Sequence, residues 1–123
     1  MPHPNFILLY VTSPAVSAAF YATLLGRPPV ESSPIFAMFA LDSGLKLGLW
    51  SRADVAPAAT ASGGGAELAI TVADADAVRA THADWHRRGF EIAQEPTAMD
   101  FGYTFVALDP DGHRLRVFAP AAP

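Results

Sequence analysis

Histidines are the residues of this sequence whose spacing most directly suggests chemistry. His82 and His86 stand four residues apart in "HADWH", a spacing superficially similar to the H-E-x-x-H helix of zinc enzymes. Ala83 stands where that helix has its glutamate, so we interpret the pair as part of a solvated helix face rather than as a zinc site. His113 follows a tight turn and is interpreted as a turn residue, and His3 lies in an N-terminal segment with prolines.

The sequence offers little support for other kinds of catalytic or cofactor-binding site. The sequence has no cysteine, which excludes disulfides, thiolate metal sites and a cysteine nucleophile. No Ser-His-Asp arrangement can be read from it, and "SGGGAE" lacks the Lys-Ser/Thr and the helix of a phosphate-binding loop. The balance of 8 basic and 12 acidic residues gives a net charge of −4, so we expect no nucleic-acid partner, whereas a neutral or cationic small molecule would not be repelled.

Aromatic residues are the remaining candidates for binding. Trp50 shares a strand face with Gly48, and the glycine leaves a flat floor where a ligand could approach the backbone. Planar rings bind to Trp, Tyr and Phe by offset stacking. Glu67 or Asp100 could orient the polar edge of such a ligand, because binding pockets are mostly apolar with few polar groups.

The elements that must position these residues occur in the same order in both halves of the chain. In the first half, a strand, a capped helix and a strand-turn-strand segment are expected at 6–11, 13–26 and 35–50. In the second half, the corresponding strand, helix, short strand and hairpin are expected at 67–72, 74–89, 90–94 and 103–118. We therefore expect a single domain, 1–123, with repeat one at 5–50, a flexible linker rich in Ala, Gly and Ser at 51–65, and repeat two at 66–119.

Alternation along the strands separates a core set of side chains from an opposite set. The expected core set is Ile7, Leu9, Val11, Leu45, Leu47, Leu49, Leu68, Ile70, Val72, Leu115 and Val117. The opposite set includes Phe6, Gly48, Trp50, Glu67 and Arg116. Under a repeat offset of 67 residues, Phe36 matches Tyr103 and Met38 matches Phe105. We expect these four side chains to alternate onto the same side of their strands and to contact a ligand there.

The helices carry apolar faces of their own. On the first helix one face is shared by Val16, Ala19, Phe20, Thr23 and Leu24. On the second helix we expect Val78, Thr81 and Trp85 to point inward.

Three segments together resemble the vicinal-oxygen-chelate superfamily, that is, the glyoxalase/bleomycin-resistance/dioxygenase fold: "VTSPAVSAAFYATLLG", "ELAITVADADAV" and "ALDPDGHRLRVF". Within it, "LGLWS" and "EPTAMDFGYTFVALDPDGHRLRV" look closest to phenazine-antibiotic resistance proteins, which bind a planar drug without a metal. The resemblance implies an α+β fold of two βαβββ modules, with curved mixed sheets and helices on the outer face. It also implies a homodimer with its pockets at or near the subunit contact.

The resemblance also points to four positions where metal enzymes of the superfamily carry a His or Glu ligand. Here these positions hold Phe6, Gly48, Glu67 and Arg116. Phe6 and Gly48 offer no donor and Arg116 is a permanent cation, so only Glu67 could coordinate. A catalytic divalent site needs about three protein ligands, so we expect neither a metal nor another cofactor. Glu67 could instead pair with Arg116 across the sheet.

The aromatic residues also have interpretations as structural residues that do not contact a ligand. Trp50 could plug the sheet edge or a dimer seam, and Phe6, Phe36 and Phe105 could be core residues. Trp85 is interpreted as helix packing.

Three hypotheses follow. The first is a non-catalytic cytoplasmic protein that sequesters a planar aromatic molecule such as a phenazine-type antibiotic. The second is a glyoxalase- or dioxygenase-like enzyme with a degenerate metal site or none, and the third is a structural or regulatory dimer with a vestigial pocket. No apolar run reaches the roughly 20 residues of a membrane helix, and the N-terminus lacks the features of a signal peptide, so we expect no membrane partner.

Overall fold

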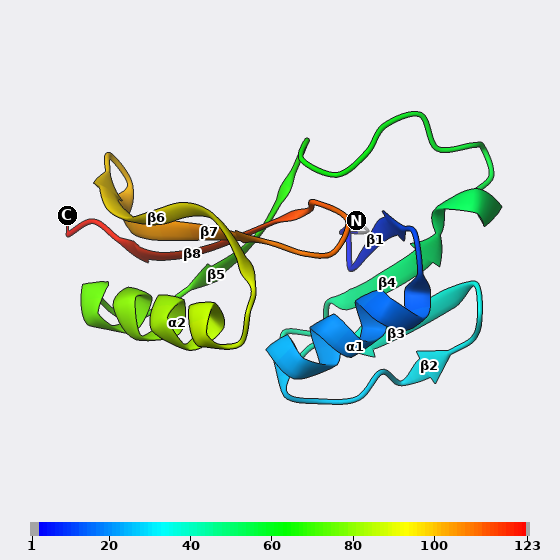
Figure 1. Ribbon diagram of the computed structural model, residues 1–123, viewed down its shortest axis with the longest axis horizontal. Helices are drawn as coiled ribbons and strands as arrows, with labels where there is room; N and C mark the ends of the chain where they lie inside the picture. The colour runs from blue at the N-terminus through cyan, green and yellow to red at the C-terminus, as the bar shows by residue number, and fades with distance from the viewer. Residues whose placement is uncertain (1–2, 123) are drawn as a thin grey trace. The chain divides into compact units, whose positions relative to one another are not determined.

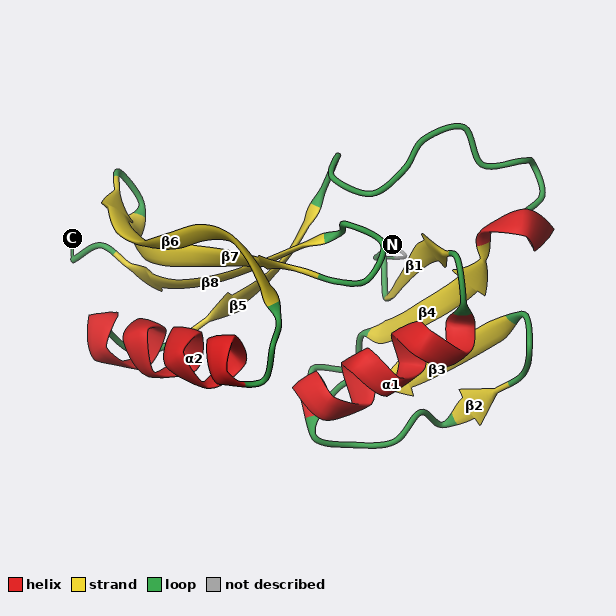
Figure 2. Cartoon of the chain, in the orientation of Figure 1, coloured by secondary structure: helices red, strands yellow, loops and turns green. Residues whose placement is uncertain are grey.

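The computed structural model describes residues 3–122 and contains two compact units, Met1–Ser62 and Gly63–Pro123. Each unit has a four-stranded mixed sheet and one α-helix. Figures 1 and 2 show the sheet and the α-helix of each unit. The order of elements in each is strand, helix and three strands, which confirms the predicted α+β fold with two βαβββ repeats.

The first unit is built around four strands and one long helix. Its elements are β1 (Phe6–Val11), α1 (Pro14–Leu25), β2 (Glu31–Ser32), β3 (Phe36–Ala40) and β4 (Lys46–Ser51). The sheet order is β1-β4-β3-β2, with β1 parallel to β4 and the other pairs antiparallel. After β4 the chain forms a short 3-10 helix, Arg52–Asp54, and buries Val55.

The second unit repeats this plan. Its elements are β5 (Glu67–Thr71), α2 (Ala75–Arg87), β6 (Glu91–Met99), β7 (Gly102–Leu108) and β8 (Arg114–Pro120). The sheet order is β5-β8-β7-β6, with β5 parallel to β8. Strand β6 runs to Met99, five residues beyond the expected end, because it follows β7 through two register shifts.

Helix α1 packs a different face on its sheet from the apolar face noted in the sequence. Ser13 caps the helix, since its Oγ accepts from the N–H of Val16 at 3.2 Å, and the buried helix residues are Pro14, Ser17, Ala18 and Tyr21. Val16 is 57% exposed. Apolar and small residues occur on all sides of this helix, so the periodicity of the sequence alone cannot identify the face that packs on the sheet.

Helix α2 packs as predicted at two of its three inward positions. Val78 and Trp85 are buried, while Thr81 is half-buried and its hydroxyl donates to the carbonyl of Ala77 at 2.8 Å. The helix is amphipathic, so its pattern identified the correct face.

The turn between β7 and β8 is held by a buried carboxylate. Asp109 Oδ1 accepts from the backbone N–H of Asp111 at 2.9 Å and of His113 at 2.8 Å. Its Oδ2 lies 2.8 Å from Nδ1 of the His113 ring. His113 is therefore a turn residue, as predicted. Among residues 3–122, no helix is long and apolar enough to cross a membrane.

Candidate ligand-binding site

The sheet of the first unit carries aromatic side chains on the face opposite α1. Strand register places Tyr10, Trp50 and Phe36 in one row across β1, β4 and β3. The next row along the strands is Leu8, Gly48 and Met38. Directly opposed side chains in a sheet lie about 5 Å apart, so these rows form one continuous surface. We name it the platform, and its members are Phe6, Leu8, Tyr10, Phe36, Met38, Gly48 and Trp50.

Gly48 lies beneath the tips of its neighbours. A Cβ atom there would lie 2.7 Å from Leu8 Cδ2, 2.8 Å from Phe6 Cε1 and 3.1 Å from Phe36 Cε1. The sequence suggested a bare floor where a ligand meets backbone. In the structure the three side chains cover that floor instead, and only glycine leaves them this room.

The platform exposes large apolar side chains. Phe6, Leu8 and Tyr10 are 38%, 46% and 38% exposed, and Trp50 is half-buried. Trp50 meets Tyr10 edge-to-face, with ring centroids 6.2 Å apart. A cluster of exposed aromatic groups is typical of a binding surface. This one can stack a flat ring system and adapt to it through Met38.

Two charged residues lie at the margins of the platform. Glu31 pairs with Met38 at the open side of β3, and Lys46 pairs with Phe6 at the start of β4. Both side chains are exposed. The sequence interpretation did not include Glu31 as a site residue, because nothing before the fold indicated that the two-residue strand β2 extends this sheet.

The second unit carries a polar cluster on the face of its sheet opposite α2. Arg116 donates from Nε to Oε1 of Glu67 at 2.8 Å and from Nη2 to Oε2 at 2.9 Å, which confirms the predicted pair. Its Nη1 donates to Gln94 Oε1 at 3.1 Å and to Thr104 Oγ1 at 3.2 Å. The guanidinium also lies 5.6 Å from the centroid of the Phe101 ring.

The charge of Arg116 changes the titration of its partner. The hydrogen bonds from Arg116 lower the pKa of Glu67 below its usual range; burial opposes this, and the charges of Arg116 and Arg114 add to it. Glu67 is consequently a carboxylate at neutral pH, with both oxygens engaged.

The four positions that the superfamily's metal enzymes use do not fit a metal ion here. Phe6 and Gly48 present no donor atom, and Arg116 presents a cation whose hydrogen bonds occupy both oxygens of Glu67. In the part of the chain that the structure describes, no group of three or more His, Cys, Asp or Glu could hold a metal ion.

The two histidines of α2, His82 and His86, lie near other side chains of the second unit. His82 is half-buried, and its ring lies 5.3 Å from that of Phe105. Its Nε2 lies 2.8 Å from Oε2 of Glu95 but without hydrogen-bond alignment. His86 is exposed, with its ring 6.0 Å from that of His82. His86 thus lies on the solvated helix face, whereas His82 joins the packing.

Tyr103 and Phe105 lie on the opposite face from the one expected. Phe105 is fully buried against Trp85 of α2, with centroids 5.4 Å apart. Tyr103 lies beneath the Arg79 guanidinium of the same helix, at 5.3 Å. The true repeat offset of the hairpin is 68, since Phe36 pairs with Trp50 as Thr104 pairs with Phe118. A slip of one residue exchanges the two faces of a strand.

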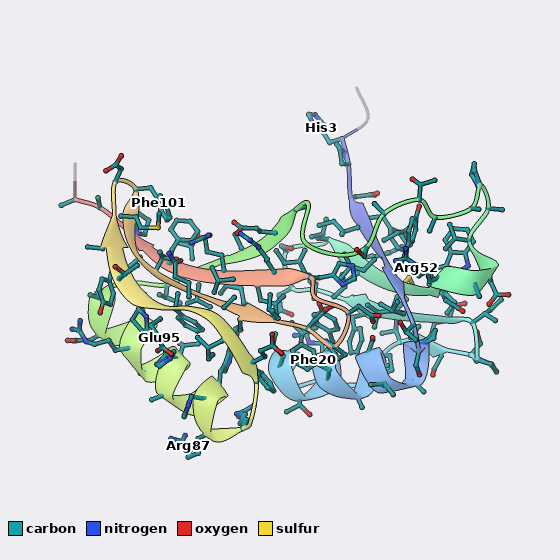
Figure 3. All side chains as sticks on the ribbon, turned by 45° about the horizontal axis from the view of Figure 1, so that its top comes forward. His3, Phe20, Arg52, Arg87, Glu95 and Phe101 are labelled. Atoms are coloured by element: carbon teal, nitrogen blue, oxygen red, sulfur yellow. The ribbon has the colours of Figure 1, made fainter. Side chains whose placement is uncertain are left out.

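Among the described residues, Asp100 forms no ion pair with the polar cluster of Glu67 and Arg116. It is exposed in the turn between β6 and β7, next to Phe101, which is labelled in Figure 3. The site residues expected from the sequence thus divide into three sets. Phe6, Phe36, Met38, Gly48 and Trp50 share the platform, Glu67 and Arg116 form the ion pair, and Asp100, Tyr103 and Phe105 join neither.

Comparison with known proteins adds a family and several relatives. The model of the glyoxalase/bleomycin resistance protein/dioxygenase superfamily matches residues 3–117. The phenazine antibiotic resistance protein EhpR of Enterobacter agglomerans is 29% identical over 119 residues, which cover 93% of this chain and 89% of that protein.

Solved structures show the same fold. An NMR structure of a protein from Agrobacterium tumefaciens is 52% identical, with a TM-score of 0.88 over 99% of this chain and 100% of the other. A glyoxalase-related enzyme from Fulvimarina pelagi has a TM-score of 0.82 at 24% identity, over 97% of this chain and 88% of the other. At that identity the likeness shows the fold alone.

Proposed function

Because the chain belongs to the glyoxalase/bleomycin resistance protein/dioxygenase superfamily, we propose that it uses this fold to bind and sequester a planar aromatic small molecule, such as a phenazine-type antibiotic, without a metal ion. The ligand stacks on the platform, with Trp50 and Tyr10 as its principal contacts. Binding itself is the function, and no chemical step is assigned to the site.

The observation that carries this proposal is the row of Tyr10, Trp50 and Phe36 on an open sheet face. Aromatic pairs contribute about 0.5–1.5 kcal/mol each beyond the burial of area. A tricyclic ring system is large enough to contact two of these side chains at once. The exposure of Phe6, Leu8 and Tyr10 in the isolated chain leaves apolar area for such a ligand to cover.

Two further observations support it. The similarity to a phenazine antibiotic resistance protein extends over 93% of this chain. The Glu67–Arg116 pair occupies two of the positions that a metal enzyme of the superfamily would use, and leaves no open coordination position there.

A fluorescence titration with chelator present tests the proposal. Wild type and Trp50→Phe would be titrated with phenazines and similar planar aromatics. The second tryptophan, Trp85, is only 6% exposed in the other unit and gives a constant background in both proteins. Saturable quenching in the wild type, largely lost in Trp50→Phe, is expected, together with a 2- to 10-fold weaker Kd by calorimetry.

Phe20→Leu is the matched control, because Phe20 is an aromatic residue of the same unit that lies on α1. Its Kd is expected to equal that of the wild type. Flat titrations with every compound would refute the proposal. Binding that chelator abolishes would favour the metal-enzyme alternative.

We also infer a homodimer that completes the pocket over the platform, which would bury the exposed apolar side chains when no ligand is present. Light scattering after size exclusion measures the mass directly against the 13.0 kDa of one chain. A monomer at micromolar concentration would contradict this part of the proposal and leave ligand binding to be judged separately.

A further inference from the structure

A hollow of about 440 Å³ adjoins the first unit where β1 and β4 end. Its lining comes from the residue after β1 and from the segment after β4: Thr12, Arg52, Ala53, Val55, Ala58 and Ala59. Five of these six side chains are small or uncharged. Arg52 is the one charged group in the lining, and Figure 3 labels it beside β1.

Arg52 differs from the other cations of its unit. Arg27 is engaged twice, donating to Asp42 Oδ1 at 2.7 Å and to the carbonyl of Ala40 at 2.8 Å. Lys46 is exposed. Arg52 is half-buried, yet no ion pair or hydrogen bond of its guanidinium is found among residues 3–122. A partly desolvated guanidinium with open donors favours a carboxylate, which it can bind at two points.

The hollow begins two residues beyond the Tyr10–Trp50 row of the platform. Tyr10 and Trp50 are directly paired, and Thr12 and Arg52 follow them by two residues on the same two chain segments. Two residues of strand extend about 7 Å. A ring system on the Tyr10–Trp50 row therefore brings a substituent on its edge within reach of the hollow.

We propose that the ligand of this protein is a planar aromatic acid, whose rings stack on the platform and whose carboxylate enters the hollow and binds to Arg52. This inference rests on the proposed function and specifies its ligand class. The chain carries a net charge of −4, so its overall field does not attract an anion. The preference for an acid must then come from a local cation, and Arg52 supplies it.

Calorimetry with two matched probes tests the inference. Phenazine-1-carboxylate and phenazine-1-carboxamide share their ring system and differ in the charge of one substituent. The wild type is expected to bind the acid about tenfold more tightly or better, as a charge-assisted hydrogen bond implies. Arg52→Gln is expected to bind the amide with unchanged Kd and to lose the preference for the acid.

Lys46→Gln is the matched control, because it removes the same charge at the opposite end of the platform. It is expected to keep the preference for the acid. Arg52→Lys keeps the charge but not the two-point geometry, and should retain part of the preference. Thermal unfolding of each variant, with a Tm close to that of the wild type, excludes a folding defect as the cause.

Equal binding of acid and amide by the wild type, or equal losses of acid binding in Arg52→Gln and Lys46→Gln, would overturn the aromatic-acid inference and leave stacking on the platform intact. If neither probe binds to any of the proteins, the proposed function fails together with this inference.

Discussion

Arg116 and Glu67 form a two-point ion pair, Nε to Oε1 at 2.8 Å and Nη2 to Oε2 at 2.9 Å, on the face of the second sheet opposite α2. Their positions are those that the superfamily's metal enzymes give to ligands. A guanidinium here supplies a positive charge to the carboxylate, as a metal ion would, but it binds oxygen atoms through N–H donors and has no coordination position. The pair therefore holds both oxygens of Glu67 in hydrogen bonds to Arg116.

Acid should weaken this pair. The pKa of Glu67 is lowered in the folded protein, so the stabilisation is fully present above the ordinary carboxylate pKa of about 4.3 and is lost as the pH falls through the lower, folded-state value. Glu67→Gln is expected to reduce the free energy of unfolding by about 1 kcal/mol at pH 7, with the difference from wild type shrinking toward pH 3. Urea unfolding followed by circular dichroism at the two pH values measures this.

Asp42→Asn serves as the control for that experiment. Asp42 pairs with Arg27, but its side chain is 90% exposed, so solvent screens the interaction. We expect little change in unfolding free energy at either pH. A Glu67→Gln deficit that is as large at pH 3 as at pH 7 would show that the side chain acts through packing and not through its charge.

The parts of the fold that the sequence predicted are those with a strong periodic pattern. The repeat, both helices and the strands around Leu47 and Val117 follow from alternation and capping, which local interactions largely determine. The packing face of α1 did not follow, because the exposed Val16 and the buried Ala18 are both apolar. Only tertiary contacts distinguish two apolar faces of one helix.

The sequence predicted site residues correctly where alternation within one strand was enough to assign their face. Trp50 and Gly48 were assigned to the correct face, whereas Tyr103 and Phe105 were assigned by a repeat offset that was wrong by one residue. Arg52 follows the last strand of its sheet in a three-residue 3-10 helix at the start of a loop, which is too short to show a periodic pattern. Loop residues of this kind become candidates only when the fold shows what surrounds them.

Phe105 should behave as a core residue. Its ring is fully buried between Trp85 and His82, at centroid distances of 5.4 and 5.3 Å. Phe105→Leu is expected to cost about 1–2 kcal/mol of unfolding free energy and to leave ligand affinity unchanged. Phe36→Leu, on the platform, should show the reverse, with less than about 1 kcal/mol of destabilisation and weaker binding. Chemical unfolding and calorimetry on both variants make the comparison.

An exchanged result would contradict the burial of Phe105 on the α2 face of its sheet. If Phe105→Leu weakened binding while it left stability intact, the side chain would have to contact the ligand.

Asp109 should matter more to stability than its place in a turn suggests. It is 6% exposed and accepts hydrogen bonds from two backbone N–H groups, those of Asp111 and His113. Asp109→Ala leaves these donors without their acceptor and is expected to cost about 2 kcal/mol, measured by urea unfolding. His113→Ala removes only the contact with Oδ2 and should cost clearly less. Equal losses would mean that the ring, not the backbone, is what the carboxylate stabilises.

Two glycines should respond differently to alanine. At Gly48 the added Cβ would meet only the side-chain tips of Leu8, Phe6 and Phe36, which can rotate away. We expect Gly48→Ala to cost about 1 kcal/mol in stability and to weaken ligand binding, because the side chains that move belong to the platform. Thermal unfolding and calorimetry measure the two effects.

Gly102 provides the contrast. Its φ is 147°, and a Cβ there would lie 2.0 Å from the carbonyl oxygen of Ala119, a backbone atom of the neighbouring strand. Backbone cannot rotate away as a side-chain tip does, so Gly102→Ala must distort the pairing of β7 with β8 and is expected to cost about 3 kcal/mol or more. If both variants unfolded at the same temperature, the close approach of β8 to Gly102 would be disproved. If Gly48→Ala bound the ligand as tightly as the wild type, the platform would not be the surface on which the ligand stacks.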